Sequence, residues 1–315
     1  MDLSGQTALV TGGAGFVGSH LVEALVSRGN EVVVVDSLST GRAEALPEDV
    51  ELIEVDLTTD GTASEVVDSS VDILFHLAAR SDPNDADPRG QFRANTTMTH
   101  ALLEAARTAG VSNVAYTSSS TVYGEAPRPT PEEYAPLEPI SVYGASKLAD
   151  EGLLSTYAHS HGMTVWNFRF ANIVGPRLRG AVIPDFIEKL HADPTRLEIL
   201  GDGRQEKSYL HVSDCIDAMC HVVEHASAAA PDRPMHTFNL GTRTTTSVDT
   251  IAEIVADELG VDPEFEYTGG ERGWTGDVSR MRLSIEKLSA LGWAAELDSI
   301  EAIRRATQEI RDELC

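Results

Sequence analysis

The sequence predicts an α/β protein with a doubly wound parallel sheet and a smaller C-terminal α/β lobe. Three observations support this fold class. Apolar runs of strand length alternate with amphipathic segments of helix length from the N-terminus to about Phe170. A glycine-dense turn joins the first apolar run to the first amphipathic segment. Several runs end in small or polar residues, as strands do at the ligand edge of an open α/β sheet. Together these features are typical of a Rossmann fold.

The stretch from Thr7 to Asp36 is predicted to be a βαβ unit. Residues 8–11 form a short apolar strand. Apolar residues then recur at helical spacing over 16–26, and the helix ends near Gly29. A second apolar run at 32–35 gives the next strand. The first two strands and the helix between them are therefore expected to pack as one unit.

The turn of this unit has the spacing of a pyrophosphate-binding loop. Gly12, Gly15 and Gly18 satisfy GxxGxxG, and Gly13 gives the alternative spelling GxGxxG. Residues without a Cβ allow a tight turn and let the backbone approach a phosphate at the N-terminus of the following helix. The alternative is a glycine-rich turn that only packs two elements together. The complete strand–helix–strand context favours a dinucleotide site.

Asp36 ends the second strand, eighteen residues after Gly18. This separation is close to the ~20 residues expected of a carboxylate that binds the adenosine ribose. A carboxylate accepts hydrogen bonds from the ribose hydroxyls and repels a 2′-phosphate, so NAD is favoured over NADP. Arg42 keeps the second cofactor open, because an arginine nearby can accommodate that phosphate.

The remaining elements continue the alternation and then change character. Further strands are predicted at 52–55, 73–77, 114–117 and 164–170, with long helices at about 89–108 and 142–161. Five prolines between Pro127 and Pro139 exclude helix and central strand and predict a loop. Beyond this point shorter elements, such as a strand at 197–200 and a helix at 248–259, predict a second lobe. We expect a cofactor-binding domain of residues 1–171 and 212–240, and a second lobe of residues 172–211 and 241–315.

The charge of the chain excludes some partners. It carries 50 acidic and 24 basic residues, for a net charge of -26. A field of this sign repels nucleic acid and anionic membrane, so neither is expected as a partner. We hypothesise a halophilic host, because ions in a salty cytoplasm screen the self-repulsion of such a protein.

Segment composition predicts a cytoplasmic protein. The N-terminus lacks the charged and apolar regions of a signal peptide, and no apolar run approaches the ~20 residues that span a bilayer. Cys215, Cys220 and Cys315 are too few for a disulfide framework, and buried thiols in a reducing compartment are expected.

Tyr143 and Lys147 are the first candidates for chemistry. They lie four residues apart in SVYGASK and therefore share one face of a helix. A phenol has an ordinary pKa near ~10, and a neighbouring ammonium is expected to lower it by about 1 to 3 units. The phenol then becomes a usable base near neutral pH. The same ammonium is expected to reach the nicotinamide ribose. Two surface residues without a function are the alternative.

Three serines, Ser118, Ser119 and Ser120, follow the fifth predicted strand. Ligands bind outside the carboxyl ends of strands in an open α/β sheet, so a hydroxyl here can share a substrate proton with Tyr143. Simple capping of the strand by these hydroxyls is the alternative.

The chain resembles the extended short-chain dehydrogenase/reductase family, and within it the NAD-dependent UDP-sugar epimerases. The resemblance covers nearly the whole chain and rests on TGGAGFVGSH at Thr11, DSLSTG at Asp36, FHLAA at Phe75, SSSTVYG at Ser118, YGASK at Tyr143, RFANIVGPR at Arg169 and GDGRQEKSYLHVSD at Gly201. The last two motifs are similar to the sugar-nucleotide half of the family pattern. With RGWTGDVSRM near the C-terminus, they are most similar to archaeal UDP-glucose and UDP-galactose 4-epimerases.

This resemblance implies an NAD-dependent epimerase with Tyr143 as base, Lys147 as its electrostatic partner and Ser119 as a catalytic hydroxyl. It implies that NAD is bound by Gly12, Gly15, Phe16, Val17, Asp36, Ser37, Asp56, Leu57, Leu77, Ala78, Ala79, Asn95, Ser118, Tyr143, Lys147 and Phe170. It implies that a UDP-sugar is bound by Ser119, Ser120, Thr121, Tyr143, Asn172, Val182, Ile183, Lys207 and Asp277. A homodimer is implied too, with the helices from about Arg89 and Val142 pairing across a two-fold axis.

The reaction type is indicated by the two residues after Ser119. Family members that dehydrate or decarboxylate nucleotide sugars have an acid there, whereas this chain has Ser120 and Thr121. Simple epimerisation at carbon 4 through a 4-keto intermediate is therefore favoured. Three alternatives stay open: epimerisation of another UDP-sugar such as UDP-glucuronate or a UDP-N-acetylhexosamine, a nucleotide-sugar reductase, and a non-catalytic NAD-binding regulatory protein.

Two positions depart from the family pattern. Lys207 and Trp274 stand where many relatives have arginines, and Arg204 or Arg272 is the expected compensation at the diphosphate. Met281 lies near the position that limits sugar size, and its flexible side chain leaves N-acetylated substrates open.

A pattern typical of zinc sites is also present. His221, Glu224 and His225 have the spacing HxxEH, yet we expect a solvated helix end there and no metal.

Overall fold

The computed structural model describes residues 1–82 and 85–314, and Cys315 lies outside the described residues. The chain forms two compact units. Unit 1 comprises residues 1–122, 142–169 and 216–238, and unit 2 comprises residues 123–141, 170–215 and 239–315. Each unit is built from segments that lie far apart in the sequence.

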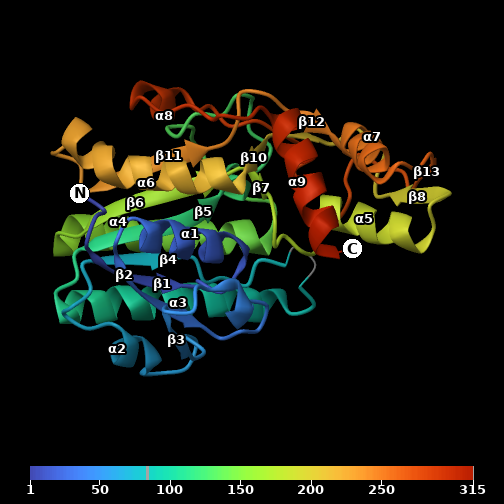
Figure 1. Cartoon of the computed structure of the whole chain (residues 1–315). Coiled ribbons are helices and arrows are strands. Elements are labelled where there is room, and N and C mark those ends of the chain that lie inside the picture. Colours follow the sequence, from blue (N-terminus) through green and yellow to red (C-terminus); the bar gives the residue numbers. More distant parts are fainter. Residues whose placement is uncertain (83–84, 315) are drawn as a thin grey trace. The chain divides into compact units, whose positions relative to one another are not determined.

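A seven-stranded sheet is the centre of unit 1 (Figure 1). Its strands, in chain order, are β1 (Thr7–Thr11), β2 (Glu31–Asp36), β3 (Glu51–Glu54), β4 (Ile73–His76), β5 (Asn113–Ser119), β6 (Thr164–Phe170) and β11 (Met235–Leu240). Their spatial order is β11-β6-β5-β4-β1-β2-β3, and the pairings among β1 to β5 are parallel. The doubly wound parallel sheet predicted from the sequence is confirmed.

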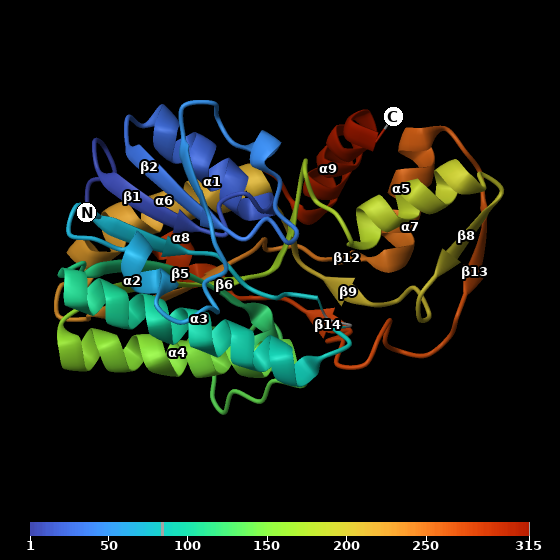
Figure 2. The ribbon, with the colours of Figure 1, turned by 90° about the horizontal axis from the view of Figure 1, so that it is seen from below.

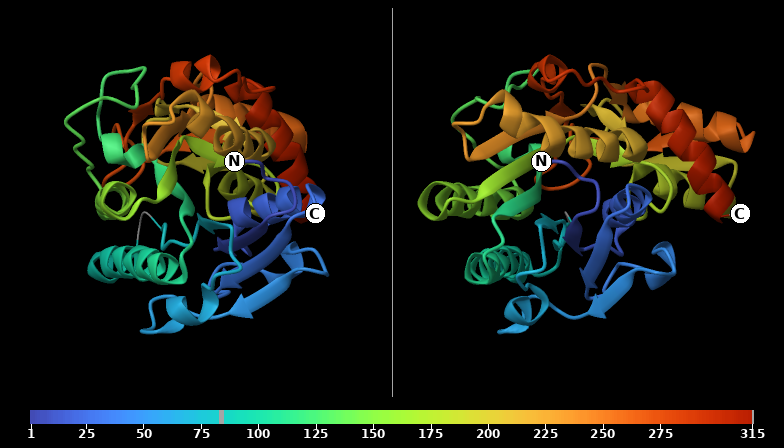
Figure 3. Two further views of the ribbon diagram at one scale, coloured as in Figure 1. Left: turned by 90° about the vertical axis from the view of Figure 1, so that its left-hand side faces the viewer. Right: turned by 60° about the vertical axis from the view of Figure 1, so that its left-hand side comes forward.

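Helices cover both faces of this sheet (Figures 2 and 3). The helices of this layer are α1 (Phe16–Ser27), α2 (Thr62–Val66), α3 (Pro88–Ala109), α4 (Val142–His161) and α6 (Val212–Ala229). Helices α3 and α4 run side by side over one face, while α1 and α6 cover the other. Coverage on both faces explains why the strands are continuous apolar runs rather than alternating ones.

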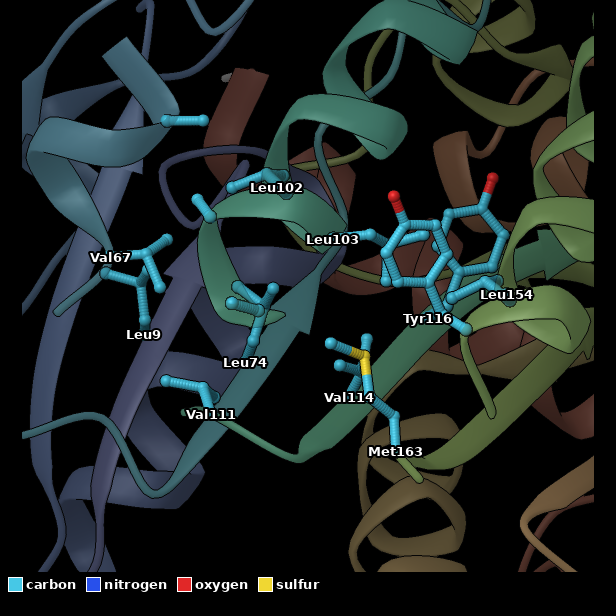
Figure 4. Packing of buried hydrophobic residues seen from close by; sticks show 14 of the residues in the cluster. Leu9, Val67, Leu74, Leu102, Leu103, Val111, Val114, Tyr116, Leu154 and Met163 are labelled. Atoms are coloured by element: carbon cyan, nitrogen blue, oxygen red, sulfur yellow. The ribbon is translucent and has the colours of Figure 1, made fainter. Parts of the chain in front are cut away.

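The core under α3 and α4 is formed by aliphatic side chains, two methionines and the tyrosines Tyr116 and Tyr157. Leu103 and Leu154 lie beside Tyr116 in Figure 4, and all three are at most 1% exposed. Each such leucine contributes about 1.5–3 kcal/mol relative to an exposed one. This core anchors α4 against strand β5, and so fixes the positions of the polar residues on both elements.

Local signals explain the bounds of the longest helix. Asp87 precedes α3 and its carboxylate accepts from the backbone nitrogen of Gly90 at 2.9 Å, while Pro88 occupies the first helical position. Gly110 ends the helix with a φ of 84°. The helix therefore begins and ends within two residues of the predicted limits.

Unit 2 consists of small sheets and a helical cluster. Its strands are β7 (Asn172–Val174), β8 (Arg196–Ile199), β9 (Glu206–Lys207), β10 (Tyr209–His211), β12 (Thr246–Ser247), β13 (Glu264–Tyr267) and β14 (Arg280–Met281). They pair as β10-β7, β12-β9-β14 and β13-β8. Its helices are α5 (Val182–Ala192), α7 (Val248–Leu259), α8 (Glu286–Ala290) and α9 (Ser299–Leu314), and α5, α7 and α9 pack around one apolar core.

The proline-rich segment 123–141 packs in unit 2, whereas the sequence-based division places it in the cofactor-binding domain. Asn239 is the residue that holds it. The Asn239 amide accepts from the Tyr123 hydroxyl at 2.7 Å and donates to the Thr130 carbonyl oxygen at 3.0 Å. Its backbone nitrogen donates to the Glu132 carboxylate at 2.9 Å. These are contacts over more than a hundred residues, which no local pattern predicts.

Among the described residues, no helix has both the length and the apolar character needed to cross a membrane. The thiols of Cys215 and Cys220 are buried and unbonded to each other. Burial raises the pKa of Cys220 to about 11, so this thiol stays protonated at neutral pH.

Candidate active site

The glycine turn lies at the point where the strand order of the sheet reverses. Strand β1 is hydrogen-bonded to β2 on one side and to β4 on the other. The chain therefore fills one half of the sheet with β1, β2 and β3, and then returns to the other side of β1 with β4. Ligands of open α/β sheets bind at such a switch point, outside the carboxyl ends of the strands. Gly12 follows β1 and residues 77–79 follow β4, so both segments border this position.

Gly12 is required by its conformation and by its surroundings. Its φ is +70°, and a Cβ at this position would lie 2.6 Å from the backbone nitrogen of Ala78. Gly18 is equally constrained, because a Cβ there would lie 2.1 Å from the carbonyl oxygen of Gly12. The turn is thus closed tightly against the end of β4 and the first turn of α1. Such a cradle is what a pyrophosphate needs in order to approach the backbone.

The beginning of α1 and the end of β2 complete the cofactor features. Gly15 is the N-cap of α1 and offers no side-chain cap, and the first turn, which contains Phe16 and Val17, has no acidic residue. The Asp36 carboxylate accepts from the backbone nitrogens of Ala14 at 3.0 Å and of Leu38 at 2.9 Å. Two carboxylate oxygens have about four acceptor sites, so capacity remains for ribose hydroxyls. These residues fit a dinucleotide.

Other expected cofactor residues are distributed around this edge. Leu77 donates its backbone N–H to the Thr11 carbonyl oxygen at 3.0 Å. Asp56 is exposed just after β3, and its carboxylate accepts from the backbone nitrogen of Thr58 at 2.8 Å. The neighbouring Leu57 side chain is buried. Ser37 follows Asp36 directly, and its hydroxyl donates to that of Ser39 at 3.1 Å.

Asn95 has its side-chain amide engaged within unit 1. It accepts from the backbone nitrogen of Arg80 at 2.8 Å, donates to the Arg80 carbonyl oxygen, and donates to the Ser146 hydroxyl at 3.0 Å. The Ser146 hydroxyl in turn donates to the carbonyl oxygen of Tyr143 at 2.8 Å. Asn95 therefore links the segment after β4 to the first turn of α4.

Tyr143 and Lys147 lie on α4, as the spacing predicts, and the lysine is fixed from strand β5. The Lys147 ammonium donates to the Thr117 carbonyl oxygen at 2.8 Å. It lies 4.6 Å from the ring centroid of Tyr116 and 5.8 Å from that of Tyr143. Lys147 is 2% exposed, which is exceptional for a lysine. A buried charge is surrounded by a low dielectric, so its electrostatic interaction with neighbouring groups is strong.

The pKa of Tyr143 differs from the sequence-based expectation. The lysine neighbour is expected to lower it, yet the pKa is raised well above its ordinary value, first by burial and second by the charge of Asp150. The physical reason is burial of the phenol, to which the negative charge of Asp150 adds, while the Lys147 ammonium donates to the Thr117 backbone carbonyl. Burial lowers the pKa of Lys147 itself to about 8, against the opposing effects of Asp150 and Glu151.

Ser119 is the last residue of β5, so the strand extends two residues beyond the predicted limit. Its hydroxyl oxygen accepts from the backbone nitrogen of Thr121 at 3.2 Å and from the Thr121 hydroxyl at 2.9 Å. A hydroxyl has two acceptor sites and one donor. Both acceptor sites are filled here, which leaves the Ser119 proton for an external acceptor. Ser120 begins a short 3-10 turn and is 9% exposed.

Ser118 points into a buried ion pair that the sequence analysis missed. Its hydroxyl donates to the Glu151 carboxylate at 2.6 Å. The same carboxylate accepts from two nitrogens of Arg169, at 2.9 Å and 2.6 Å. This bidentate pair links β5, α4 and β6, and it fixes the strand end that carries Ser119. The sequence offered a signal: Glu151 lies one helical turn after Lys147 and therefore on the same face.

In unit 2, Asn172 has a donor without a partner. Its backbone nitrogen donates to the Ser208 carbonyl oxygen at 3.2 Å, because β7 lies beside β10. Its side-chain nitrogen is buried and has no hydrogen-bond partner among the described residues. A buried polar atom without a partner costs about 1–3 kcal/mol, so a ligand that accepts a hydrogen bond from this nitrogen would remove that cost. Phe170, two residues earlier, is half-buried.

Val182 and Ile183 are the first residues of α5. The N-cap residue Ala181 makes no side-chain cap, so the first amides of this helix have no side-chain acceptor. The Ile183 side chain is fully buried in the apolar core of unit 2. A role for Ile183 in ligand binding therefore rests on its backbone and not on its side chain.

Lys207 and Asp277 form an ion pair. The Lys207 ammonium lies 2.5 Å from one Asp277 oxygen, and the Gly273 backbone nitrogen donates to the other at 3.1 Å. Asp277 is 2% exposed. The Lys207 ammonium also lies 4.9 Å from a ring centroid of Trp274. Asp277 is thus already engaged on both oxygens, and the cation is fixed by one carboxylate and one aromatic ring.

The two arginines expected to compensate for Lys207 have other environments. Arg272 forms an ion pair with Glu125 at 2.5 Å. Arg204 lines a cavity of about 420 Å³ that also includes Glu206, Asp249 and Arg280, but not Lys207. Neither guanidinium joins the Lys207–Asp277 pair.

The HxxEH residues lie on α6. Arg28 forms an ion pair with Glu224 at 3.1 Å, and the rings of His221 and His225 stack at 4.2 Å between centroids. Within the described residues, no group of three or more metal-binding side chains is present.

Known proteins share the sequence and the fold. The model of the NAD dependent epimerase/dehydratase family matches residues 8–241. The UDP-glucose 4-epimerase of Mycolicibacterium smegmatis is 33% identical over 96% of this chain and 98% of its own. A UDP-galactose 4-epimerase crystal structure superimposes with a TM-score of 0.90, at 41% identity over 98% of this chain and 100% of that chain. The UDP-glucose 4-epimerase of Thermus thermophilus, solved in complex with NAD, has a TM-score of 0.84 at 33% identity, covering 97% of this chain and 99% of that one.

Proposed function

The chain belongs to the NAD dependent epimerase/dehydratase family, and on this basis we propose that it interconverts UDP-glucose and UDP-galactose by inverting carbon 4 of the hexose. It is an NAD-dependent nucleotide-sugar epimerase. The observation that carries the proposal is the presence, in one unit, of the glycine cradle at Gly12 together with Tyr143, Lys147 and a Ser119 hydroxyl that has a proton to donate.

The chemistry divides between the cofactor and the chain. The residues around Gly12 and Asp36 would hold NAD, which would supply reversible hydride transfer at carbon 4 and a positive charge that would favour the phenolate of a nearby tyrosine. Tyr143 accepts the proton of the 4-hydroxyl and gives it back when the sugar is reduced again. Lys147 stabilises the phenolate electrostatically and is held for this purpose by the Thr117 carbonyl.

Ser119 is proposed to hold the reacting hydroxyl. Both acceptor sites of its oxygen are occupied by Thr121, so its proton points toward an acceptor outside this turn. A donor in that place stabilises negative charge on the sugar oxygen as its proton leaves. Because the next two residues are Ser120 and Thr121, no carboxyl group is available there for dehydration or decarboxylation. Simple epimerisation follows from this residue choice.

For the UDP part of the substrate we propose a set of polar groups in unit 2. Asn172 has an unpartnered buried donor, and the first amides of α5 at Val182 and Ile183 lack a side-chain cap. Lys207 supplies the cation for the diphosphate, with Asp277 as its partner. Lysine is a point charge and lacks the planar fork of arginine, so weaker diphosphate binding than in an arginine-containing relative is expected.

The assembly and setting of the protein are also proposals. We propose a homodimer that forms through α3 and α4, and a cytoplasmic location in which the buried thiols of Cys215 and Cys220 stay reduced. The net charge of -26 supports a salt-rich cytoplasm.

One experiment tests the function directly. The purified protein is incubated in high salt with UDP-glucose, UDP-galactose, UDP-glucuronate and two UDP-N-acetylhexosamines, with and without added NAD, and the products are identified by NMR. We expect interconversion of the first two, with no net consumption of NAD. Conversion of UDP-glucuronate or of the N-acetylated sugars instead would reassign the substrate. Formation of a dehydrated sugar, or no reaction at all, would contradict the proposal. The Tyr143→Phe variant is the control for a contaminating epimerase.

A further inference from the structure

The mechanism above does not use the buried carboxylate of Asp150, which lies near Lys147. Asp150 is on α4, three residues after Lys147 and therefore on the same side of the helix. It is 1% exposed. The Tyr116 hydroxyl donates to one of its oxygens at 2.7 Å, and the other oxygen is buried without a hydrogen-bond partner in the part of the chain that the structure describes. Burial raises the pKa of this carboxyl, and the Tyr116 hydroxyl, the positive charge of Lys147 and the Thr99 hydroxyl oppose that effect and favour the carboxylate.

The charged neighbours of Asp150 identify the cation that acts on it. Glu151 accepts from two of the three nitrogens of the Arg169 guanidinium, and the opposite charges of this pair largely cancel. His76, on β4, is neutral because burial and the nearby Lys147 lower its pKa to about 3. Lys147 remains as the positive charge that acts on Asp150. Its ammonium lies 4.6 Å from the centroid of the ring whose hydroxyl holds Asp150.

Lys147 depends on Asp150 in the same way. The only group to which its ammonium donates within the described residues is the neutral carbonyl of Thr117. Burial disfavours its charged form, and Asp150 is the first of two carboxylates that oppose this effect. Among the described residues no direct ion pair joins the two groups, but both contact Tyr116: the ammonium lies over its ring and the carboxylate accepts from its hydroxyl.

We propose that Asp150, held in place by the Tyr116 hydroxyl, is a positioning residue for the reaction: its carboxylate is the counter-charge that keeps Lys147 an ammonium next to Tyr143. The catalytic part of this role rests on the proposed function, because it requires Tyr143 and Lys147 to take part in the reaction. The electrostatic part stands on the geometry of unit 1 alone. The groups that face Lys147 are Tyr143, Asp150 and Glu151 from α4, Tyr116 and the Thr117 carbonyl from β5, and His76 from β4.

The chain offers a direct way to measure the charge of Lys147. It has four lysines, at positions 147, 189, 207 and 287. In protein labelled with ¹³C at the lysine ε-carbon, the Lys147 signal is identified by its loss in Lys147→Met. Its titration midpoint is expected at about 8 in the native protein. In Asp150→Asn we expect it to fall by about 1 unit or more, because an opposite charge nearby shifts a pKa by ~1–3 units.

Matched variants separate charge from packing. Tyr116→Phe removes the hydroxyl but leaves the carboxylate, so the Lys147 midpoint is expected to move by less than half as much as in Asp150→Asn. Asp150→Glu keeps the charge and is expected to restore most of the native midpoint. If Asp150→Asn does not fold, Asp150→Ser provides a smaller uncharged replacement. An unchanged Lys147 midpoint in the uncharged variant would overturn the proposal, whether or not the protein is an epimerase.

The pH dependence of turnover gives the catalytic readout. The charge of Asp150 raises the pKa of both Tyr143 and Lys147. Its removal is therefore expected to shift the whole curve of turnover against pH, on its acidic and on its alkaline side, toward lower pH. A merely structural role lowers turnover without moving either side of the curve. Native protein that lacks epimerase activity contradicts the proposed function, whereas active protein whose curve stays in place in Asp150→Asn contradicts this inference.

Discussion

Gly12 and Ala78 approach each other so closely that a Cβ on Gly12 would lie 2.6 Å from the Ala78 backbone nitrogen. This contact brings the carboxyl ends of β1 and β4 together at the switch point of the sheet. Gly29 offers a comparison inside the same βαβ unit, because its φ of +78° is similar and a Cβ on Gly29 would have no neighbour within 4 Å.

Gly12→Ala is expected to abolish NAD binding, and Gly29→Ala is expected to retain it. Both substitutions impose a left-handed conformation on alanine, at a cost of about 1–2 kcal/mol. Only the first also displaces the turn from Ala78. Isothermal titration with NAD and thermal unfolding of both variants measure the difference. Equal loss of NAD affinity in the two variants would contradict the role of the close approach.

Tyr143→Phe is expected to lower turnover by ~10²–10⁴, the usual contribution of a general acid–base group, while NAD affinity stays within a few-fold of native. The variant removes the proton acceptor and keeps the ring. Tyr157→Phe is the matched control, because Tyr157 lies on the same helix and its hydroxyl donates to Glu104 on α3. NMR rates of UDP-sugar interconversion decide the matter. Full activity in Tyr143→Phe would remove this residue from the mechanism.

Asn172→Ala is expected to raise the KM for the UDP-sugar with little effect on kcat or on folding stability. The Asn172 side-chain nitrogen has no partner within the described residues, so the substitution removes no protein hydrogen bond from it. Asn239→Ala is the contrasting variant, since that side chain makes three hydrogen bonds and its loss is expected to destabilise the protein. Steady-state kinetics and urea unfolding distinguish the two. A large stability loss in Asn172→Ala would contradict a ligand-binding role.

His76 is expected to make the protein acid-sensitive. Its ring nitrogens face the hydroxyls of Thr11 and Thr99, at 2.8 Å and 3.0 Å, and burial is the larger cause that lowers its pKa to about 3 from 6.5. Between these values the unfolded chain binds a proton that the folded chain does not, so stability falls as the pH falls below 6.5. The loss from this group approaches about 1.4 kcal/mol per pH unit and ends near pH 3.

Urea unfolding of the native protein and of His76→Asn between pH 7.5 and pH 5 tests this assignment at constant salt concentration. The carboxylates are the same in both proteins, so the difference between the two slopes belongs to the histidine. Identical slopes would show that His76 does not carry the effect.

Potassium chloride is expected to stabilise the protein. A net charge of -26 produces self-repulsion that ions screen over a Debye length of about 10 Å at 0.1 M and about 3 Å at 1 M. The melting temperature should therefore rise by several degrees between dilute buffer and molar salt. A melting temperature that does not rise would remove the hypothesis of a salt-adapted protein.

The first six strands of the large sheet, its helices α1, α3 and α4, the glycine turn and the shared face of Tyr143 and Lys147 could be predicted from the amino-acid sequence, whereas β11 and the short helix α2 were not. Periodicity, glycine spacing and helix caps such as Asp87 act over a few residues, so they can be read from the chain directly. Three features could not be predicted in this way: the place of segment 123–141, the raised pKa of Tyr143 and the counter-charge at Asp150. Burial and charge are set by side chains that packing brings together from distant segments, as Tyr116 and Asp150 are, and no local pattern carries that information.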